Sequence, residues 1–405
     1  MRKSLTTHST IAIACISINS YGGQVISNGA DIQINTDGGL KVATRDKESK
    51  FQLGGRLMWD YDNFNHSNIG GTEGSESELR RGRIYVKGTI RTNWSYKLQF
   101  EFKSIENTDG GNSVDLEDAY IVYSGLPVQL KFGRFHRPVG LEELTSSKNT
   151  STIERAAFWD IVPSSRSDYN FQIGQYKTDY TWAIGIYENE DSNEEGIKDS
   201  NGNLTYSYGG RATYLPTNTD ASKIHIGISY LHRDFDNNLQ RAYLRTRLAT
   251  HTADKIALAD AGTTGKKSNQ IGLEVAWVSG SFSLQSEYMR YKITTDNTVA
   301  NDVEFYGYYL QATHSLTGES RVYQQGSFDK IKPSSFGGAW ELVLKYEHGH
   351  ADYLTTSKYD LTTLGVNWYI NSNVRASLNY LTGETDNTGK NDNFDAISTR
   401  LQLTF

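Results

Sequence analysis

Long segments of alternating polarity dominate this sequence from residue 51 onward. Apolar and polar side chains alternate over nine to thirteen positions at a time, as in RIYVKGTIR (83–91) and KIHIGISYL (223–231), and no long 3.6-residue period appears. Strands of soluble sheets are mostly five or six residues long, whereas a strand that crosses a bilayer needs about nine to eleven. The longer length predicts strands that cross a membrane.

The number and spacing of these segments predict the architecture. Sixteen can be counted, and their connections alternate between tight turns and longer polar loops, as in outer-membrane barrels. The connection over 316–336 breaks this alternation and is either an elaborated turn or a sign of a miscounted strand. We therefore expect an all-β fold, a 16-stranded antiparallel transmembrane β-barrel with inward-folded loops. The segments begin near residues 51, 78, 94, 114, 127, 169, 180, 204, 222, 269, 281, 303, 337, 359, 373 and 393.

Composition excludes several other classes of protein. Only 37% of the residues are hydrophobic and no run of eighteen apolar residues occurs, which argues against a helical membrane protein. Aromatic residues make up 12% of the chain, whereas disordered segments lack them. A net charge of -6 argues against nucleic acid as a partner.

The amino-terminal segment has the pattern of an export signal. Arg2 and Lys3 precede an apolar stretch over 10–18, which is the right length for a secretory signal and too short for a membrane anchor. Cys15 could belong to a lipoprotein box, although the residues before it match poorly. We expect residues 1–22 to be a signal peptide and residues 51–405 to form the barrel.

Strand periodicity also predicts which side chains line the bore. Because the two faces of a strand alternate, placing the apolar side chains toward lipid assigns their neighbours to the lumen. The inward cations outnumber the inward acids although the whole chain is acidic, and a narrow bore lined by cations favours anions. The predicted inward cations are Arg56, Arg81, Arg83, Lys87, Lys97, Lys103, Lys131, Arg211, Lys345, Arg375 and Arg400, and the inward acids are Asp60, Glu101, Asp118, Glu274, Glu287, Glu341 and Glu347.

The segment ELRRGRIYVKG (78–88) is the most informative one. Its apolar residues leave Arg81, Arg83, Lys87 and Arg91 in an inward column. Such a column could pass an oxyanion from one guanidinium to the next, or its members could pair with carboxylates across the lumen.

Three long connections add further cations, which line the pore or belong to solvated surface. The connection over 136–168 is long enough to fold inward and narrow the bore. These cations are Arg137, Lys148, Arg155 and Arg166 in that connection, Arg241, Arg245 and Arg247 in the loop over 233–268, and Arg321, Lys330 and Lys332 in the turn over 316–336.

Several motifs resemble those of a known family, the phosphate-selective porins O and P of Gram-negative outer membranes. The resemblance covers essentially the whole chain after the signal. The motifs are GGRLMWD (54–60), ELRRGRIYVKG (78–88), YKLQFEF (96–102), LEDAYIVY (116–123), KFGRFHRPVGLEEL (131–144), ERAAF (154–158), EYM (287–289), LTGESRVY (316–323) and GAWELVLKY (338–346).

What the resemblance implies is a homotrimer of barrels in the outer membrane, narrowed by inward loops, with an arginine ladder leading to a central anion site. Arg80 and Arg81 match the family's paired arginines at that site, and Asp118 matches an acidic residue there. The resemblance further places Arg241, Arg245 and Arg247 in the outer ladder, and Lys330 and Lys332 on the periplasmic side. Residues 23–50 would form an amino-terminal periplasmic arm.

The last strand ends in an aromatic residue. Ile397, Leu401 and Leu403 share one face with the terminal Phe405. This ending resembles the signal that the bacterial barrel-assembly machinery reads, which would make that machinery a partner along with outer-membrane lipid.

We expect a passive diffusion channel for anions, with phosphate as the leading candidate and neither a cofactor nor a metal. The alternatives are a general, weakly selective porin and an outer-membrane barrel enzyme such as a lipase. The enzyme is disfavoured because His225 and Ser229 lie four apart on one strand, about 13 Å from each other. The candidate pore-lining residues are Arg56, Arg80, Arg81, Arg83, Lys87, Asp118, Lys131, Arg137, Lys148, Arg155, Arg211, Arg241, Arg245, Arg247, Lys330, Lys332 and Lys345.

Overall fold

The structure is a computed structural model of the 405-residue chain. It describes residues 25–26, 32–36, 38–66, 74–103, 113–162, 166–189, 203–239, 242–248, 250–262, 265–295, 301–387 and 390–405. The expected signal peptide, residues 1–22, lies outside the described residues. No helix in the described part is long and apolar enough to span a membrane.

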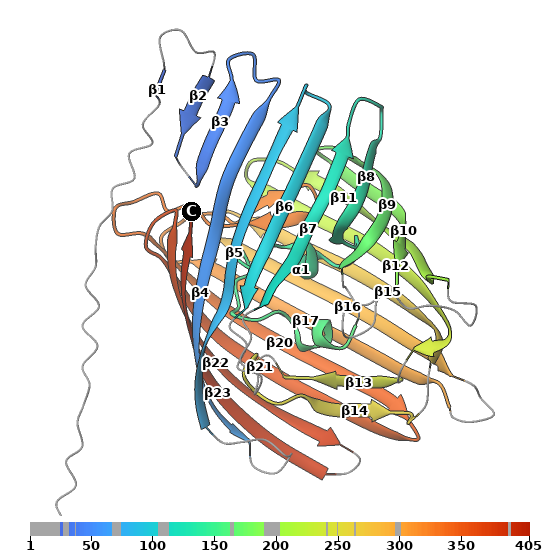
Figure 1. The fold of residues 1–405 in the computed structure, drawn as a ribbon. Helices are drawn as coiled ribbons and strands as arrows, with labels where there is room; N and C mark the ends of the chain where they lie inside the picture. The colour runs from blue at the N-terminus through green and yellow to red at the C-terminus, as the bar shows by residue number, and fades with distance from the viewer. Residues whose placement is uncertain are drawn as a thin grey trace, which may run out of the picture.

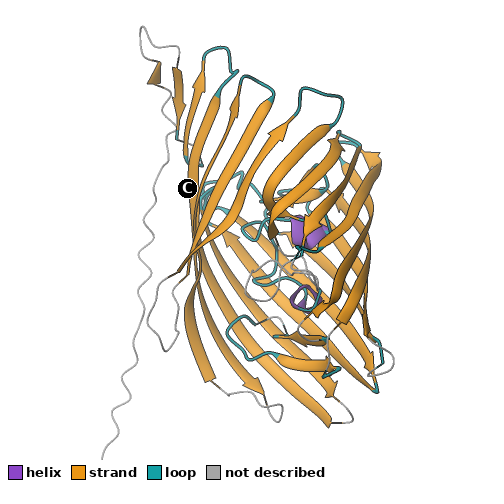
Figure 2. Cartoon of the chain, turned by 45° about the vertical axis from the view of Figure 1, so that its right-hand side comes forward, coloured by secondary structure: helices purple, strands orange, loops and turns teal. Residues whose placement is uncertain are grey.

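Sixteen antiparallel strands form one closed barrel, which confirms the predicted fold class (Figures 1 and 2). The barrel closes where β23 pairs with β4, from Phe394 opposite His66 to Thr404 opposite Arg56. The strands are β4 (Lys50–His66), β5 (Gly74–Ile90), β6 (Trp94–Lys103), β7 (Ser113–Tyr123), β8 (Gln129–His136), β9 (Arg166–Tyr176), β10 (Tyr180–Glu188), β11 (Tyr206–Asn218), β12 (Ser222–Leu239), β15 (Gly265–Ser279), β16 (Phe282–Thr295), β17 (Val303–Ser315), β20 (Ala339–Tyr353), β21 (Thr355–Tyr369), β22 (Val374–Asn387) and β23 (Lys390–Thr404).

The two faces of the strands carry opposite kinds of side chain. Large apolar residues such as Trp59, Ile84 and Leu344 point outward and are 40–50% exposed. Trp340 and Trp368 stack with their ring centroids 5.3 Å apart on the outer surface. Inward positions hold buried polar and charged groups instead. This pattern suits a barrel whose outside contacts lipid and whose inside contacts water and loops.

Short turns gather at one end of the barrel, beside the carboxyl terminus (Figure 1). The first of them, over 91–93, contains Arg91 in the left-handed region with φ 48°. Arg91 is therefore an exposed turn residue, and the prediction that it extends the inward column of β5 is wrong. At the opposite end most connections are long, but Leu354 alone separates β20 from β21.

Before the barrel, three short strands lengthen the sheet beyond the short-turn end (Figure 1). They are β1 (Val25–Ile26), β2 (Ile32–Asn35) and β3 (Leu40–Thr44). β3 pairs with the first four residues of β4, over 50–53. The strands β1 to β3 thus extend the barrel wall.

Three segments fold into the bore and fill much of it. We call residues 137–162 the constriction loop; it contains α1 (Leu141–Leu144) and the 3-10 helix η1 (Ala157–Asp160), which lie inside the barrel (Figure 2). The hairpin of β13 (Tyr243–Thr246) and β14 (Ile256–Asp260) packs beside η1. The hairpin of β18 (Val322–Gln324) and β19 (Ser327–Asp329) enters from the short-turn end. The 316–336 connection is therefore an elaborated turn, and no strand was miscounted.

An apolar core holds the constriction loop and the β13–β14 hairpin mainly against the strands β16 to β23. Phe158 of η1 stacks with Tyr309 of β17 at 6.0 Å, and Leu244 and Leu258 of the β13–β14 hairpin belong to the same buried cluster. A barrel lumen lined only by polar residues would hold water here. The core instead leaves the water-accessible space on the opposite side, along β4 to β9.

Candidate functional site

Three neighbouring cavities follow the β4–β9 side of the bore. The central one, of about 420 Å³, lies between this wall and the constriction loop. One of about 200 Å³ adjoins it toward the long loops, and both are lined by Arg80, Arg81, Glu143, Arg155 and His251. The third, of about 520 Å³, shares Lys97 with the central cavity and lies toward the short-turn end. We call this series of cavities the passage, and the five residues that the first two share its crossing.

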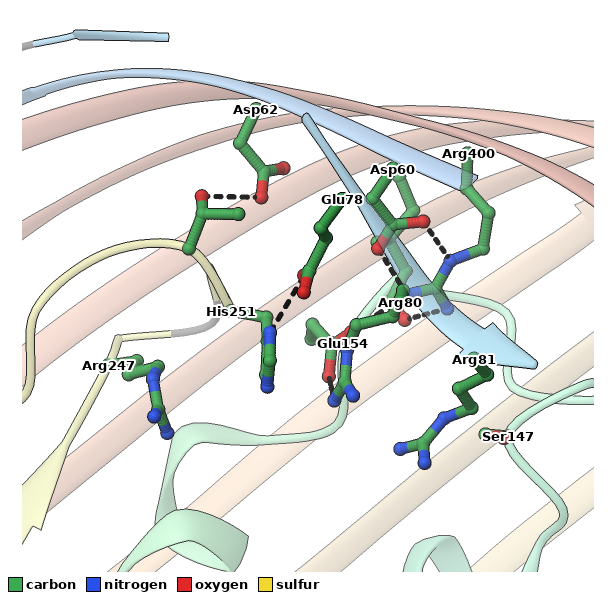
Figure 3. A network of polar contacts seen from close by, with 12 residues as sticks. Asp60, Asp62, Glu78, Arg80, Arg81, Ser147, Glu154, Arg247, His251 and Arg400 are labelled. Atoms are coloured by element: carbon green, nitrogen blue, oxygen red, sulfur yellow. Dashed lines mark hydrogen bonds and ion pairs between the residues drawn. The ribbon is translucent and has the colours of Figure 1, made fainter. Parts of the chain in front are cut away.

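A β-bulge in β5 explains how two adjacent arginines reach the crossing. Met58 of β4 lies opposite Arg81, but the next residue, Trp59, lies opposite Leu79, so Arg80 is an extra residue. A bulge interrupts the strict alternation of faces. Arg80 turns inward and donates to both carboxylate oxygens of Glu154 in the constriction loop, at 2.8 and 3.0 Å (Figure 3).

A second bulge, in β7, brings two adjacent acids into the same cavity. Gln99 of β6 faces Asp118 and Phe100 faces Leu116, which leaves Glu117 as the extra residue. Arg166 of β9 bridges the two acids, 2.8 Å from Glu117 and 3.1 Å from Asp118. Sequence periodicity assigned only Asp118 to the lumen, and it missed Glu117 because a bulge leaves no periodic signal.

The cations of the passage wall are unequally neutralised. Arg83 forms a bidentate pair with Glu101, both bonds at 2.8 Å, and also contacts Glu117. Arg81 reaches Glu101 only at 3.5 Å, and Arg56 donates to the neutral hydroxyl of Ser146 at 2.8 Å. Cations thus remain in excess around the central cavity. The cationic lining residues are Arg56, Arg80, Arg81, Arg83, Lys97, Arg155 and Arg166, and the acidic ones are Glu101, Glu117, Asp118 and Glu143.

Two cations of the constriction loop, Arg155 and Lys148, have different surroundings. Arg155 donates to the backbone carbonyls of Glu142, Glu143 and Thr145, at 2.9–3.2 Å, and so satisfies the open carbonyl end of α1 while facing the crossing. No acidic side chain of the described residues pairs with Lys148. Burial, together with the charges of Arg56 and Lys330, lowers the pKa of Lys148 to about 8.

Gly140 permits the bend with which the constriction loop enters α1. Its φ is +73°, in the left-handed region, and a Cβ there would lie 2.2 Å from the ring of Trp159. A side chain at this position would therefore push α1 and η1 apart.

Charged side chains on the opposite side of the barrel, on β16 and β20, bind the constriction loop and do not face the passage. Lys345 of β20 is fully buried between Glu142, at 3.0 Å, and Glu347, at 3.2 Å. Glu287 of β16 accepts the backbone N–H groups of Leu141 and Glu142, at 2.6 and 2.9 Å. Lys345, a candidate pore-lining residue, is thus inward as periodicity predicted but lies outside the passage.

The same anchoring continues along β22 and β23. Arg375 donates to the carbonyl of Thr150 at 2.8 Å. Arg400 forms two bonds to Asp60, at 2.6 and 2.7 Å, and also contacts Glu154 (Figure 3). Glu154 therefore lies between Arg80 and Arg400, and the two guanidinium groups hold its pKa well below the usual range although burial opposes this.

The remaining candidate residues differ in their surroundings. Arg211 pairs with Glu274 at 2.5 and 2.8 Å and donates to the carbonyl of Gly326, so it anchors the β18–β19 hairpin. Arg137 is fully buried and donates to the carbonyl of Glu188 at 2.7 Å. The ammonium of Lys131 lies over the rings of Tyr120 and Phe135, and that of Lys330 contacts the carbonyl of Ser372. Arg247 lines the cavity of about 200 Å³, and Lys87 lines the third cavity. Arg245 and Lys332 are exposed. Arg241 and the side chain of Lys103 lie outside the described residues.

The histidine considered for an enzyme takes part in a different network. The ring of His225 contacts Glu274 at 3.1 Å and the hydroxyl of Tyr323 at 2.7 Å. In the described part of the chain no three His, Cys, Asp or Glu side chains are grouped as metal ligands.

Comparison with known proteins identifies the family. The family model "Phosphate-selective porin O and P" matches residues 51–405, the whole barrel. The chain belongs to the phosphate-selective porin O and P family. Porin O of Pseudomonas aeruginosa is 33% identical over 98% of both chains, and an uncharacterized protein of Caulobacter vibrioides is 25% identical over 76% of this chain and 62% of its own.

Solved structures support the fold of this porin. An anion-selective porin from Comamonas acidovorans matches with a TM-score of 0.57 at 12% identity, over 88% of this chain and all of its own. OmpT of Vibrio cholerae matches with a TM-score of 0.56 at 10% identity, over 88% of this chain and 98% of its own. Family and fold together place this porin in the Gram-negative outer membrane, with its short turns at the periplasmic end. Its family consists of channels, not enzymes.

Proposed function

We propose that this porin lets small anions diffuse passively through the passage, with phosphate as the leading candidate. The observation that carries the proposal is the crossing, where Arg80, Arg81 and Arg155 line both cavities, whereas Glu143 is the one carboxylate that the two cavities share. An inward loop and an apolar core confine anions to this space. Confinement between low-dielectric walls focuses the positive potential.

Arginine suits oxyanions for a geometric reason. A guanidinium presents several N–H donors in one plane, and charge-assisted hydrogen bonds from it can replace part of an oxyanion's hydration shell. Cations are spaced along the whole passage, so an anion can exchange one partner for the next and move down its gradient without chemistry. From the outer to the periplasmic end these cations are Arg247, then Arg80, Arg81 and Arg155, then Arg56, Arg83 and Arg166, then Lys97 and Lys87.

A second candidate function is a general, weakly selective porin. Several arginines of the central cavity are paired with carboxylates, as Arg83 is with Glu101 and Arg166 is with Glu117. Such pairs reduce the net potential that a passing anion meets.

Bilayer conductance distinguishes these functions. We expect reversal potentials of anion-selective sign in a KCl gradient, and a decrease of chloride current when inorganic phosphate is added. Cation-selective potentials would contradict the proposal. Anion selectivity without block by phosphate would favour the general porin.

We also propose the assembly and targeting of this porin. One matched structure is a trimer form of OmpT, which supports a homotrimer here. The exposed side chain of Phe405 and the outward Ile397 and Leu401 suit recognition by the barrel-assembly machinery and contact with lipid. The extension of β1 to β3 supports a periplasmic arm over residues 23–50, after removal of a signal peptide over residues 1–22. Cross-linking in detergent tests the trimer, and amino-terminal sequencing of the mature protein tests the signal.

A further inference from the structure

Two histidines line the passage at positions where added charge would act on every passing anion. His251, from the loop between β13 and β14, lies at the crossing, and His136, the last residue of β8, lines the central cavity. Their side chains are 35% and 25% exposed, so water in the passage can exchange protons with both. The proposed function does not use either of them.

Each histidine contacts a carboxylate from a different element. Nδ1 of His251 lies 2.7 Å from Glu78 of β5, and Nδ1 of His136 lies 3.4 Å from Glu143 of α1 (Figure 3 shows the first pair). These contacts fix both rings at the edge of the passage. A neutral His251 ring leaves the charge of Glu78 in place, whereas a protonated ring cancels it. Glu143 also pairs with Arg155 at 3.3 Å, so a protonated His136 adds a positive charge beside a pair that is already neutral.

We propose that His136 and His251 determine how strongly the porin prefers anions, through a charge that each gains when it is protonated. The inference rests on the proposed function, because it concerns the same passage. Histidine is the side chain whose unperturbed pKa, about 6.5, lies within the pH range of ordinary surroundings. Acidification should therefore strengthen the preference for anions, in the same direction at both sites.

Other charged groups lie around the two histidine rings. The test must distinguish their effects from those of the histidines. Around His251 they are Glu78, Arg80, Arg81, Glu143, Glu154, Arg155, Asp160 and Arg247, and around His136 they are Lys97, Glu117, Asp118, Lys131, Glu143, Arg155, Arg166 and Arg211. Most are arginines, which keep their charge at any ordinary pH, or carboxylates, which ordinarily titrate near pH 4. Lys131 is neither an arginine nor a carboxylate, and it stays in place in variants of the histidines.

The test uses the full-length porin in planar bilayers with a KCl gradient and phosphate-free buffers. Chloride and potassium keep their charge at every pH, so a change in the reversal potential reports the protein alone. Between pH 7 and pH 5, where Lys148 stays charged, we expect the permeability ratio of chloride to potassium to rise about fivefold, the size of one unit charge acting across 4 Å in water. The double variant with His136→Asn and His251→Asn should lose this rise, and each single variant should lose part of it.

A matched control is His314→Asn. His314 lies on the outer surface, where its ring stacks on Phe282 at 4.1 Å, so its removal should leave the pH dependence intact. An anion-selective wild type without pH dependence would overturn the inference while the proposed function stands. A pH dependence that persists in the double variant would also overturn it and would assign the effect to other groups, such as Lys131. Cation selectivity at every pH would instead contradict the proposed function.

Discussion

The two sides of this bore carry the same kinds of charged residue and use them differently. On the β4–β9 side Arg81 and Lys97 keep 12% and 24% of their side chains exposed and face the passage. On the β16–β23 side Lys345 and Arg400 are 0% and 1% exposed and bind the constriction loop. An inward charge can therefore serve permeation or loop anchoring, depending on what covers it.

The energetic consequences differ as well. A charge in the passage can be removed at small cost to folding where its partner keeps another cation, as Glu101 would keep its bidentate pair with Arg83. A buried charge whose partner is deleted leaves that partner without compensation, which costs about 3–5 kcal/mol. Substitutions on the two sides should thus separate effects on permeation from effects on stability.

The largest effect is expected for Lys345→Met on the anchoring side. The substitution leaves Glu142 and Glu347 buried without their cation, so the barrel should lose about 3–5 kcal/mol of stability. Because Glu142 lies in α1 of the constriction loop, we also expect a larger conductance and a weaker anion preference. Urea titration followed by gel mobility measures the first, and bilayer recording the second. Lys358→Met, at an exposed outward position, is the control, and equal behaviour of the two variants would refute the anchoring role.

Arg81→Ala should have the next largest effect, on permeation alone. Arg81 lies at the crossing with only a 3.5 Å contact to Glu101, so its removal should lower the ratio of chloride to potassium permeability about tenfold, with little change in stability. Arg290→Ala removes the same kind of side chain from the outer surface, where Arg290 pairs with Glu304, and should leave selectivity unchanged. Unaltered selectivity in Arg81→Ala would make Arg81 a scaffold residue.

A smaller effect should come from Lys148, which lies in the constriction loop near Arg56. Its pKa is lowered to about 8, so it is charged below pH 8 and neutral above. Between pH 7 and pH 9 we expect anion preference to fall about twofold as this charge is lost. Lys148→Arg should remove the fall because arginine keeps its charge. The same decline in wild type and variant would show that another group titrates.

The smallest effect is expected for Lys332→Ala at the periplasmic turn. Lys332 is exposed, and salt at 0.1 M screens charges beyond about 10 Å. Chloride conductance in 0.1 M KCl should drop by less than about 20%. A loss as large as that of Arg81→Ala would extend the selective part of the pore to this turn.

Much of the fold could be predicted from the chain, but less of the site. The number of strands and the side to which each residue points follow from the alternation of side chains along a strand. Sequence periodicity therefore correctly placed Arg56, Arg83, Asp118 and Lys345 in the lumen. Arg80 and Glu117 face inward only because each lies at a bulge, and the first was placed only through the family resemblance. The constriction loop was expected to fold inward, but the sequence did not indicate which wall it would cover.

The sequence by itself determined a closed barrel with a charged interior, because side-chain alternation along a strand is a property of the backbone of each strand. The tertiary structure alone decided which inward charges line the passage. That choice depends on contacts between residues far apart in the chain, such as Glu287 with α1 and Phe158 with Tyr309, which press the inner segments against one side of the wall. A two-residue period cannot encode on which side those contacts form.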